Sequence, residues 1–114
     1  MKIIISESQE LDIKKKFIFM LLNNMNYNLI EINDNIYFVK NIGDKSAEIR
    51  YDKSDGWCGI SVNLISFLSS MTGFKWSEVQ ELIVKWVEHT LQMKVKYNQR
   101  RTGRRQITLN IPYN

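Results

Sequence analysis

The chain has little of the residues that cross-link a fold or anchor it in a membrane. Its 114 residues include one cysteine, one proline and one histidine. The single cysteine, Cys58, excludes an internal disulfide and suits a small core residue in a reducing compartment. After Lys2 to Ile5 the sequence turns polar too soon for a secretory signal, and the apolar run Phe17 to Leu22 is far shorter than the ~20 residues of a membrane span. We therefore expect a cytoplasmic protein without membrane contact.

Motifs for catalysis and for cofactor binding are also missing. The sequence contains no glycine-rich phosphate loop, no zinc-ligand spacing and no GxSxG nucleophile motif. Asp52, Asp55 and Gly56 lack the alternate-residue spacing and the closing glutamate of a calcium loop. Cys58 and His89 are the residues that a catalytic pair would need, but no local pattern supports that pairing. We therefore expect no enzyme activity, no cofactor and no metal site.

Acidic residues are missing from the last quarter of the chain. Residues 1–88 hold ten Lys or Arg and all twelve Asp or Glu, a net charge of −2, whereas residues 89–114 carry +6. Such a split is typical of a surface for nucleic acid, for an anionic membrane or for an acidic protein. The six cations are Lys94, Lys96, Arg100, Arg101, Arg104 and Arg105.

The strongest structural signal is a helix over Ser77 to Gln92. Its apolar residues recur at helical spacing, and most polar residues fall on the other side. Ser77 and Gln80 are spaced as a capping box, which predicts that the helix begins there. The apolar positions are Val79, Leu82, Ile83, Trp86, Val87 and Leu91.

Periodicity and turn residues predict the other elements of one α+β domain spanning residues 1–114. A strand at Lys2 to Ile5 precedes an N-terminal helix at about Glu7 to Asn24. Three stretches, at 29–33, 36–42 and 47–52, form a three-stranded antiparallel meander. A short helix at about 61–72 forms a two-helix hairpin with the helix at 77–92, and Gly73 suits the left-handed residue that ends it. The first residues of 57–62 fit a strand or a helix start.

Residues 94–111 are predicted to form a basic β-hairpin, the C-terminal extension of the domain. Both Lys94 to Tyr97 and Gln106 to Ile111 resemble strands. A two-residue turn at Thr102-Gly103 would place apolar residues opposite polar ones. A three-residue loop at 101–103 instead pairs Tyr97 with Ile107 and Val95 with Leu109, with Gly103 at the left-handed position. The cations then share the opposite face and the tip, and Pro112 ends the last strand.

Two segments resemble short, uncharacterised proteins of tailed bacteriophages. They are the opening KIIISESQ and the helical stretch EVQELIVKWVEH, which follows a tyrosine-bearing strand and a short apolar helix. The resemblance implies a phage-encoded protein and implies no activity.

The basic hairpin is the main functional signal. Lys and Arg neutralise phosphates and release counterions, which gives affinity for DNA or RNA without sequence reading. We therefore expect a small non-catalytic nucleic-acid-binding accessory protein that uses the six cations. The alternative is a protein-interaction module, a virion component or an inhibitor of a host protein, in which the hairpin docks on an acidic partner or on another copy of the chain. Solvation of a sheet edge by four arginines is the third interpretation.

Overall fold

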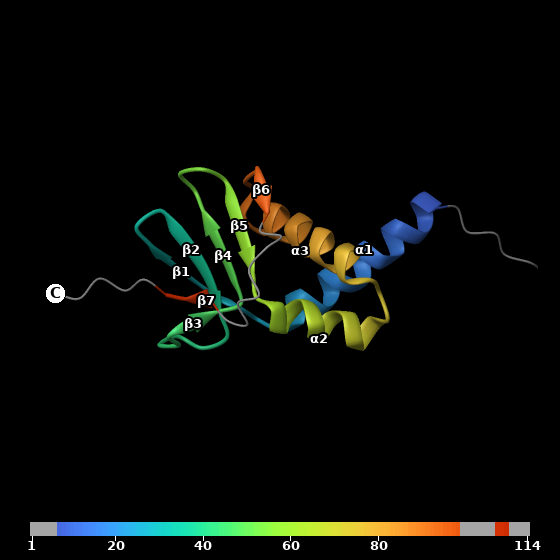
Figure 1. The fold of residues 1–114 in the computed structure, drawn as a ribbon, viewed down its shortest axis with the longest axis horizontal. Helices are drawn as coiled ribbons and strands as arrows, with labels where there is room; N and C mark the ends of the chain where they lie inside the picture. Colours follow the sequence, from blue (N-terminus) through green and yellow to red (C-terminus); the bar gives the residue numbers. More distant parts are fainter. Residues whose placement is uncertain (1–6, 99–106, 110–114) are drawn as a thin grey trace, which may run out of the picture.

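The structure, a computed structural model, describes residues 7–98 and 107–109. In that part of the chain three helices cover one face of a five-stranded sheet (Figure 1). The helices are α1 (Glu7–Asn24), α2 (Val62–Thr72) and α3 (Trp76–Leu91). The predicted α+β class is confirmed, and the helix bounds agree with the predictions to within one residue. The predicted strand at Lys2 to Ile5 lies outside the described residues.

The main sheet has the strand order β1-β2-β4-β5-β6. Its first four strands form an antiparallel meander, and β6 joins β5 in parallel. A second, two-stranded sheet pairs β3 with β7. The strands of the main sheet are β1 (Asn28–Ile32), β2 (Asn35–Val39), β4 (Ile49–Asp52), β5 (Trp57–Ile60) and β6 (Tyr97–Asn98). The small sheet consists of β3 (Ser46–Ala47) and β7 (Ile107–Thr108).

The meander has one antiparallel strand more than the three predicted. The additional strand is β5, which continues the alternation by placing Cys58 and Ile60 in the core. Ser61 follows directly as the N-cap of α2, and its hydroxyl accepts a hydrogen bond from the Leu64 N–H at 3.2 Å. The segment that the sequence left open is thus a strand that leads straight into a helix. Gly73 ends α2 in the predicted left-handed conformation, with φ of 76°.

The start of α3 differs from the prediction. The helix begins at Trp76, and Lys75 is the N-cap residue, with extended backbone and no hydrogen bond from its side chain. The capping box at Ser77 and Gln80 is therefore wrong, because Ser77 lies inside the first turn. Glu78 in that turn forms an ion pair with Lys14 of α1, at 2.8 Å. Helix α3 thus begins earlier than the capping pattern predicted, and its first turn contacts α1.

The predicted pairing of the C-terminal hairpin is also wrong for the described residues. Tyr97 pairs with Trp57 of β5, and Ile107 pairs with Ala47 of β3, so the two segments belong to different sheets. The physical reason is the connection through α2 and α3, since a helical crossover delivers the next strand parallel to the previous one. The predicted loop at 101–103 and Pro112 lie outside the described residues.

The core lies between the sheet and the helices. Strand alternation sends one set of apolar side chains towards the helices and the other set to the outer face, where a smaller cluster packs under β3 and β7. The helix-facing core includes Ile18, Leu22, Ile36, Phe38, Ile49, Tyr51, Cys58, Ile60, Leu64, Leu68, Val79, Leu82, Ile83, Trp86 and Val87. The outer cluster is formed by Tyr37, Val39, Ala47 and Leu109.

Candidate nucleic-acid interface

The main chain of the segment that follows α3 is bonded both to α3 and to the sheet with its β4–β5 turn. The Val95 N–H donates to the Glu88 carboxylate at 2.9 Å, and the Lys96 N–H donates to the Gly56 carbonyl at 2.8 Å. The Tyr51 hydroxyl donates to the Lys94 carbonyl at 2.9 Å. Val95 packs against the core, whereas the side chains of both lysines are exposed. The backbone is therefore fixed while the two ammonium groups face water.

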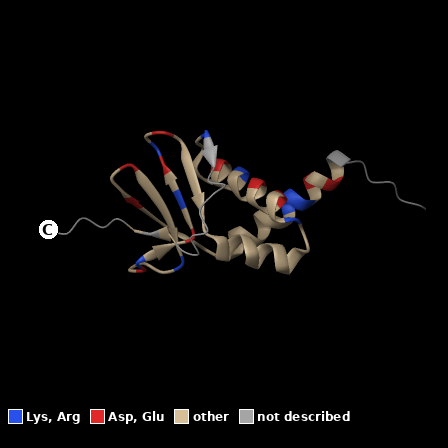
Figure 2. Cartoon of the chain, viewed as in Figure 1, with Lys and Arg blue, Asp and Glu red and all other residues tan. Residues whose placement is uncertain are grey.

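Lys94 and Lys96 form no ion pair with any described carboxylate. Several other lysines do, for example Lys16 with Asp12 at 3.1 Å and Lys40 with Glu48 at 3.1 Å. Figure 2 shows acidic and basic residues interspersed along α3, and a basic segment leading into β6 beside the start of β5. Because no described carboxylate neutralises them, the two lysines can attract an anion.

The four arginines of the predicted binding site lie outside the described residues. Arg100, Arg101, Arg104 and Arg105 fall in sequence between β6 and β7. The structure therefore brings together Lys94 and Lys96 at the edge of β5, and leaves the predicted grouping of all six cations as a prediction.

Lys96 lies directly over Gly56. A Cβ atom added to that glycine would meet the Lys96 Cγ at 2.9 Å and its Cβ at 3.1 Å. Gly56 also has a φ of +76°, which favours glycine. The close approach of the two backbones thus needs the glycine, and it brings a lysine next to the first residue of β5.

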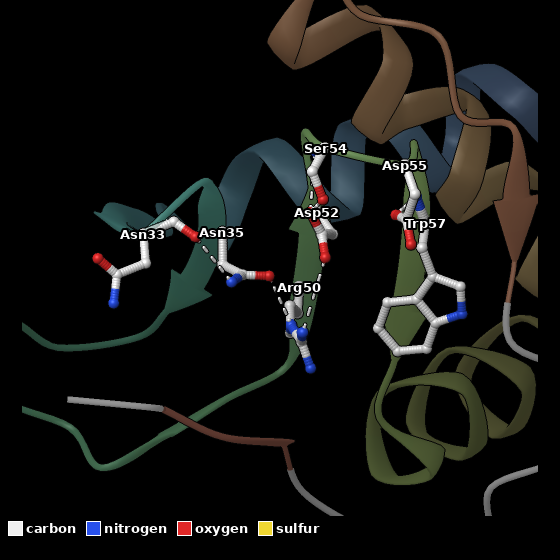
Figure 3. Close-up of polar contacts among 7 residues, drawn as sticks. All are labelled: Asn33, Asn35, Arg50, Asp52, Ser54, Asp55 and Trp57. Carbon is white, nitrogen blue, oxygen red and sulfur yellow. Dashed lines mark hydrogen bonds and ion pairs between the residues drawn. The ribbon is translucent and has the colours of Figure 1, made fainter. Parts of the chain in front are cut away.

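An arginine–tryptophan pair lies on the outer face of the sheet, and the sequence analysis did not single it out. Arg50 of β4 donates from Nε to the Asn35 Oδ1 at 2.8 Å, and its Cζ lies 5.2 Å from the centre of the Trp57 ring (Figure 3). The Arg50 Nη2 is 4.0 Å from the Asp52 carboxylate. The polar alternation in β4 indicated that Arg50 faces outwards, but Trp57 fell in the ambiguous segment.

The acidic groups near this pair are used by the turn between β4 and β5. The Asp52 carboxylate accepts hydrogen bonds from the Ser54 hydroxyl at 2.6 Å and the Ser54 N–H at 2.9 Å, and these bonds lower the pKa of Asp52. Asp55 accepts a hydrogen bond from the Trp57 N–H at 2.9 Å. Both carboxylates therefore stabilise the turn that sets the position of Trp57.

Cys58 is not placed for chemistry. It is fully buried in the core, and burial raises the pKa of its thiol to about 12. A protonated thiol is a poor nucleophile. His89 lies on the exposed side of α3, with its ring 5.7 Å from that of Phe19. Among the described residues no cluster of three or more His, Cys, Asp or Glu could hold a metal ion.

Searches against models of known protein families, against curated proteins and against solved structures find no match. The resemblance of KIIISESQ and of the α3 sequence to tailed-bacteriophage proteins therefore stays a prediction. Within the described part of the chain, no helix has the length and apolar character needed to cross a bilayer.

Proposed function

We propose that the chain is a small, non-catalytic nucleic-acid-binding protein that contacts phosphates through its cationic segment, residues 94–105. The observation that carries the proposal is the placement of Lys94 and Lys96, which are exposed, held at the sheet edge by main-chain bonds, and without a described ion-pair partner. The next residues add Arg100, Arg101 and two further arginines with no acidic residue between them. The resemblance to bacteriophage proteins would place this role in the cytoplasm of an infected cell.

Cationic contacts of this kind have a measurable signature. The plot of log K against log salt has a negative slope, and each phosphate that is neutralised makes it steeper, by about 0.9 for duplex DNA and about 0.7 for single strands. Replacing Lys94 and Lys96 with alanine should therefore weaken binding and make the slope shallower by roughly 1.4 to 1.8. Replacing the four arginines as well should make the slope shallower still, without changing any preference for sequence.

The experiment measures fluorescence anisotropy with duplex DNA, single-stranded DNA and RNA at several salt concentrations. The matched control replaces Lys75 and Lys85 with alanine. Both are exposed lysines, one at the N-cap and one in the body of α3, so the control removes the same amount of charge. That control should leave the slope nearly unchanged. The proposal fails if the unmodified protein binds none of the three nucleic acids at low salt, or if the two double variants lose affinity equally.

Self-association is the second candidate function, and apolar residues on the outer side of α1 support it. Ile13 and Met20 are 55% and 48% exposed, and with Phe17 they follow the i, i+4, i+7 spacing of one helix face. Packing this face against the same face of a second copy would remove these apolar side chains from water, which favours association.

Light scattering after size-exclusion chromatography separates this candidate from the first. A dimer that Ile13→Glu or Met20→Glu converts to a monomer would support self-association. Leu29→Glu is the matched control, because Leu29 is 49% exposed on β1. If the protein is a monomer at all accessible concentrations, self-association is excluded, and the proposal of nucleic-acid binding still stands.

A further inference from the structure

Trp57 lies outside both apolar clusters of the described chain. The helix-facing core includes Cys58 and Ile60 of the same strand, and the outer cluster consists of Tyr37, Val39, Ala47 and Leu109. Alternation along β5 instead places Trp57 on the outer face, where it is partly exposed. The indole is partly in water, so some of its apolar surface remains for a ligand to cover.

Arg50 lies next to this ring. Its guanidinium donates to the Asn35 amide oxygen, and its Cζ is 5.2 Å from the ring centre, beside the indole in Figure 3. An arginine this close to an aromatic ring adds a cationic, planar group to the aromatic surface. The result is a preformed platform of one ring and one guanidinium on the outer face of the sheet.

The platform adjoins the start of the cationic segment. Gly56, the residue before Trp57, accepts the hydrogen bond from the Lys96 N–H, and Trp57 itself pairs with Tyr97. The Lys96 side chain packs on Gly56. An aromatic surface on one strand and exposed lysines just before the neighbouring strand are a combination that binds single-stranded nucleic acids, since their backbone follows the cations while their bases stack.

We propose that Trp57, beside Arg50, stacks on an unpaired base, so that the ligand of this surface is single-stranded nucleic acid. This inference rests on the proposed function, because Lys94 and Lys96 supply the phosphate contacts. Duplex bases are stacked on one another and present only their edges in the grooves, so they offer no face to an indole. The protein should therefore bind single strands more tightly than duplexes of equal charge.

The test compares oligothymidylate, oligouridylate and a DNA duplex by fluorescence anisotropy. Trp57→Leu should weaken single-strand binding by roughly 5- to 150-fold, because a stacked base contributes about 1–3 kcal/mol. The salt slope should remain unchanged, since no phosphate contact is lost. Trp57→Phe should retain most of the affinity because it keeps a ring. Trp76→Leu is the control, since Trp76 is 45% exposed and begins α3 at the end far from β6 (Figure 1).

A second measurement uses the unmodified protein and does not depend on the folding of a variant. The indole N–H resonance of Trp57, assigned by its loss in Trp57→Phe, should shift on addition of oligothymidylate, while the resonance of Trp76 should not. The inference is overturned if the duplex binds as tightly as single strands, if Trp57→Leu binds like Trp76→Leu, or if the Trp57 resonance does not shift. In those cases the salt slope still reports whether Lys94 and Lys96 contact phosphate. Absence of all binding would overturn both proposals.

Discussion

Replacing Gly56 with alanine tests how closely the cationic segment is held against the sheet. Two effects add at this position. The backbone φ of +76° is unfavourable for an L-residue by about 1–2 kcal/mol. The new methyl group would also lie 2.9 Å from the Lys96 Cγ and 3.1 Å from its Cβ. These atoms are near the main chain, so the side chain cannot avoid the methyl group by rotating its end, and the backbone at residue 96 must move.

Gly73 provides the control, because it has the same φ of +76° and no atom within 4 Å of an added Cβ. Its N–H donates to the Ser69 carbonyl at 2.8 Å, as the Gly56 N–H does to the Asp52 carbonyl. Gly73→Ala should therefore show only the conformational term, about 1–2 kcal/mol. Gly56→Ala should show that term and a further ~1–3 kcal/mol from overpacking.

Urea denaturation of both variants gives the difference between them. Lys96→Ala removes the Cγ contact, so the double variant Gly56→Ala, Lys96→Ala should be more stable than the sum of the single changes indicates, by about 1 kcal/mol. If Gly56→Ala and Gly73→Ala agree within about 0.5 kcal/mol, the close packing of Lys96 on Gly56 is not present in solution. The cationic segment would then not be held tightly against the edge of the sheet.

Three further predictions concern the body of the protein. Cys58 should resist a thiol reagent at pH 8 until urea unfolds the chain, since burial raises the pKa of its thiol to about 12. Asn23→Ala should destabilise the fold by about 1 kcal/mol, because the Asn23 Oδ1 accepts the indole N–H of Trp86 at 2.9 Å, and the loss should vanish in a Trp86→Phe background. The pKa of Asp52 is lowered by Ser54, so its stabilisation is complete above its unfolded pKa near 3.8 and is lost as the pH falls below it. In thermal melts, Ser54→Ala should therefore lose less stability than the unmodified protein on acidification below pH ~4.

Helices were the most predictable elements because their periodic pattern is long. Glu7–Asn24 and Trp76–Leu91 each repeat an apolar face over several turns, and each was located to within one residue. The end of α2 at Gly73 could be predicted from the local sequence, because the left-handed conformation that ends a helix favours glycine. The start of α3 was less predictable, because it involves the contact between Glu78 and Lys14, which are far apart in sequence.

The strand at Trp57–Ile60 was ambiguous because four residues are too few to separate a period of 2 from a period of 3.6. This ambiguity also concealed the candidate stacking surface. The sequence indicates that Arg50 faces outwards, but only the pairing of β4 with β5 brings Trp57 beside it. Contacts between neighbouring strands depend on register, which is a tertiary property that local pattern does not determine.

The pairing of Tyr97 shows how a correct strand prediction can lead to a wrong partner. Alternation of Val95 and Tyr97 with lysines specifies which side of the segment is apolar, and it is satisfied equally by pairing with Ile107 or with β5. The edge of β5 needs a partner for its backbone groups, and the crossover through α2 and α3 brings residues 96–98 to it in parallel. This pairing bears on the proposed function. The cationic segment begins beside Trp57 on the main sheet, so its first lysines adjoin an aromatic surface, which the predicted free hairpin would not have provided.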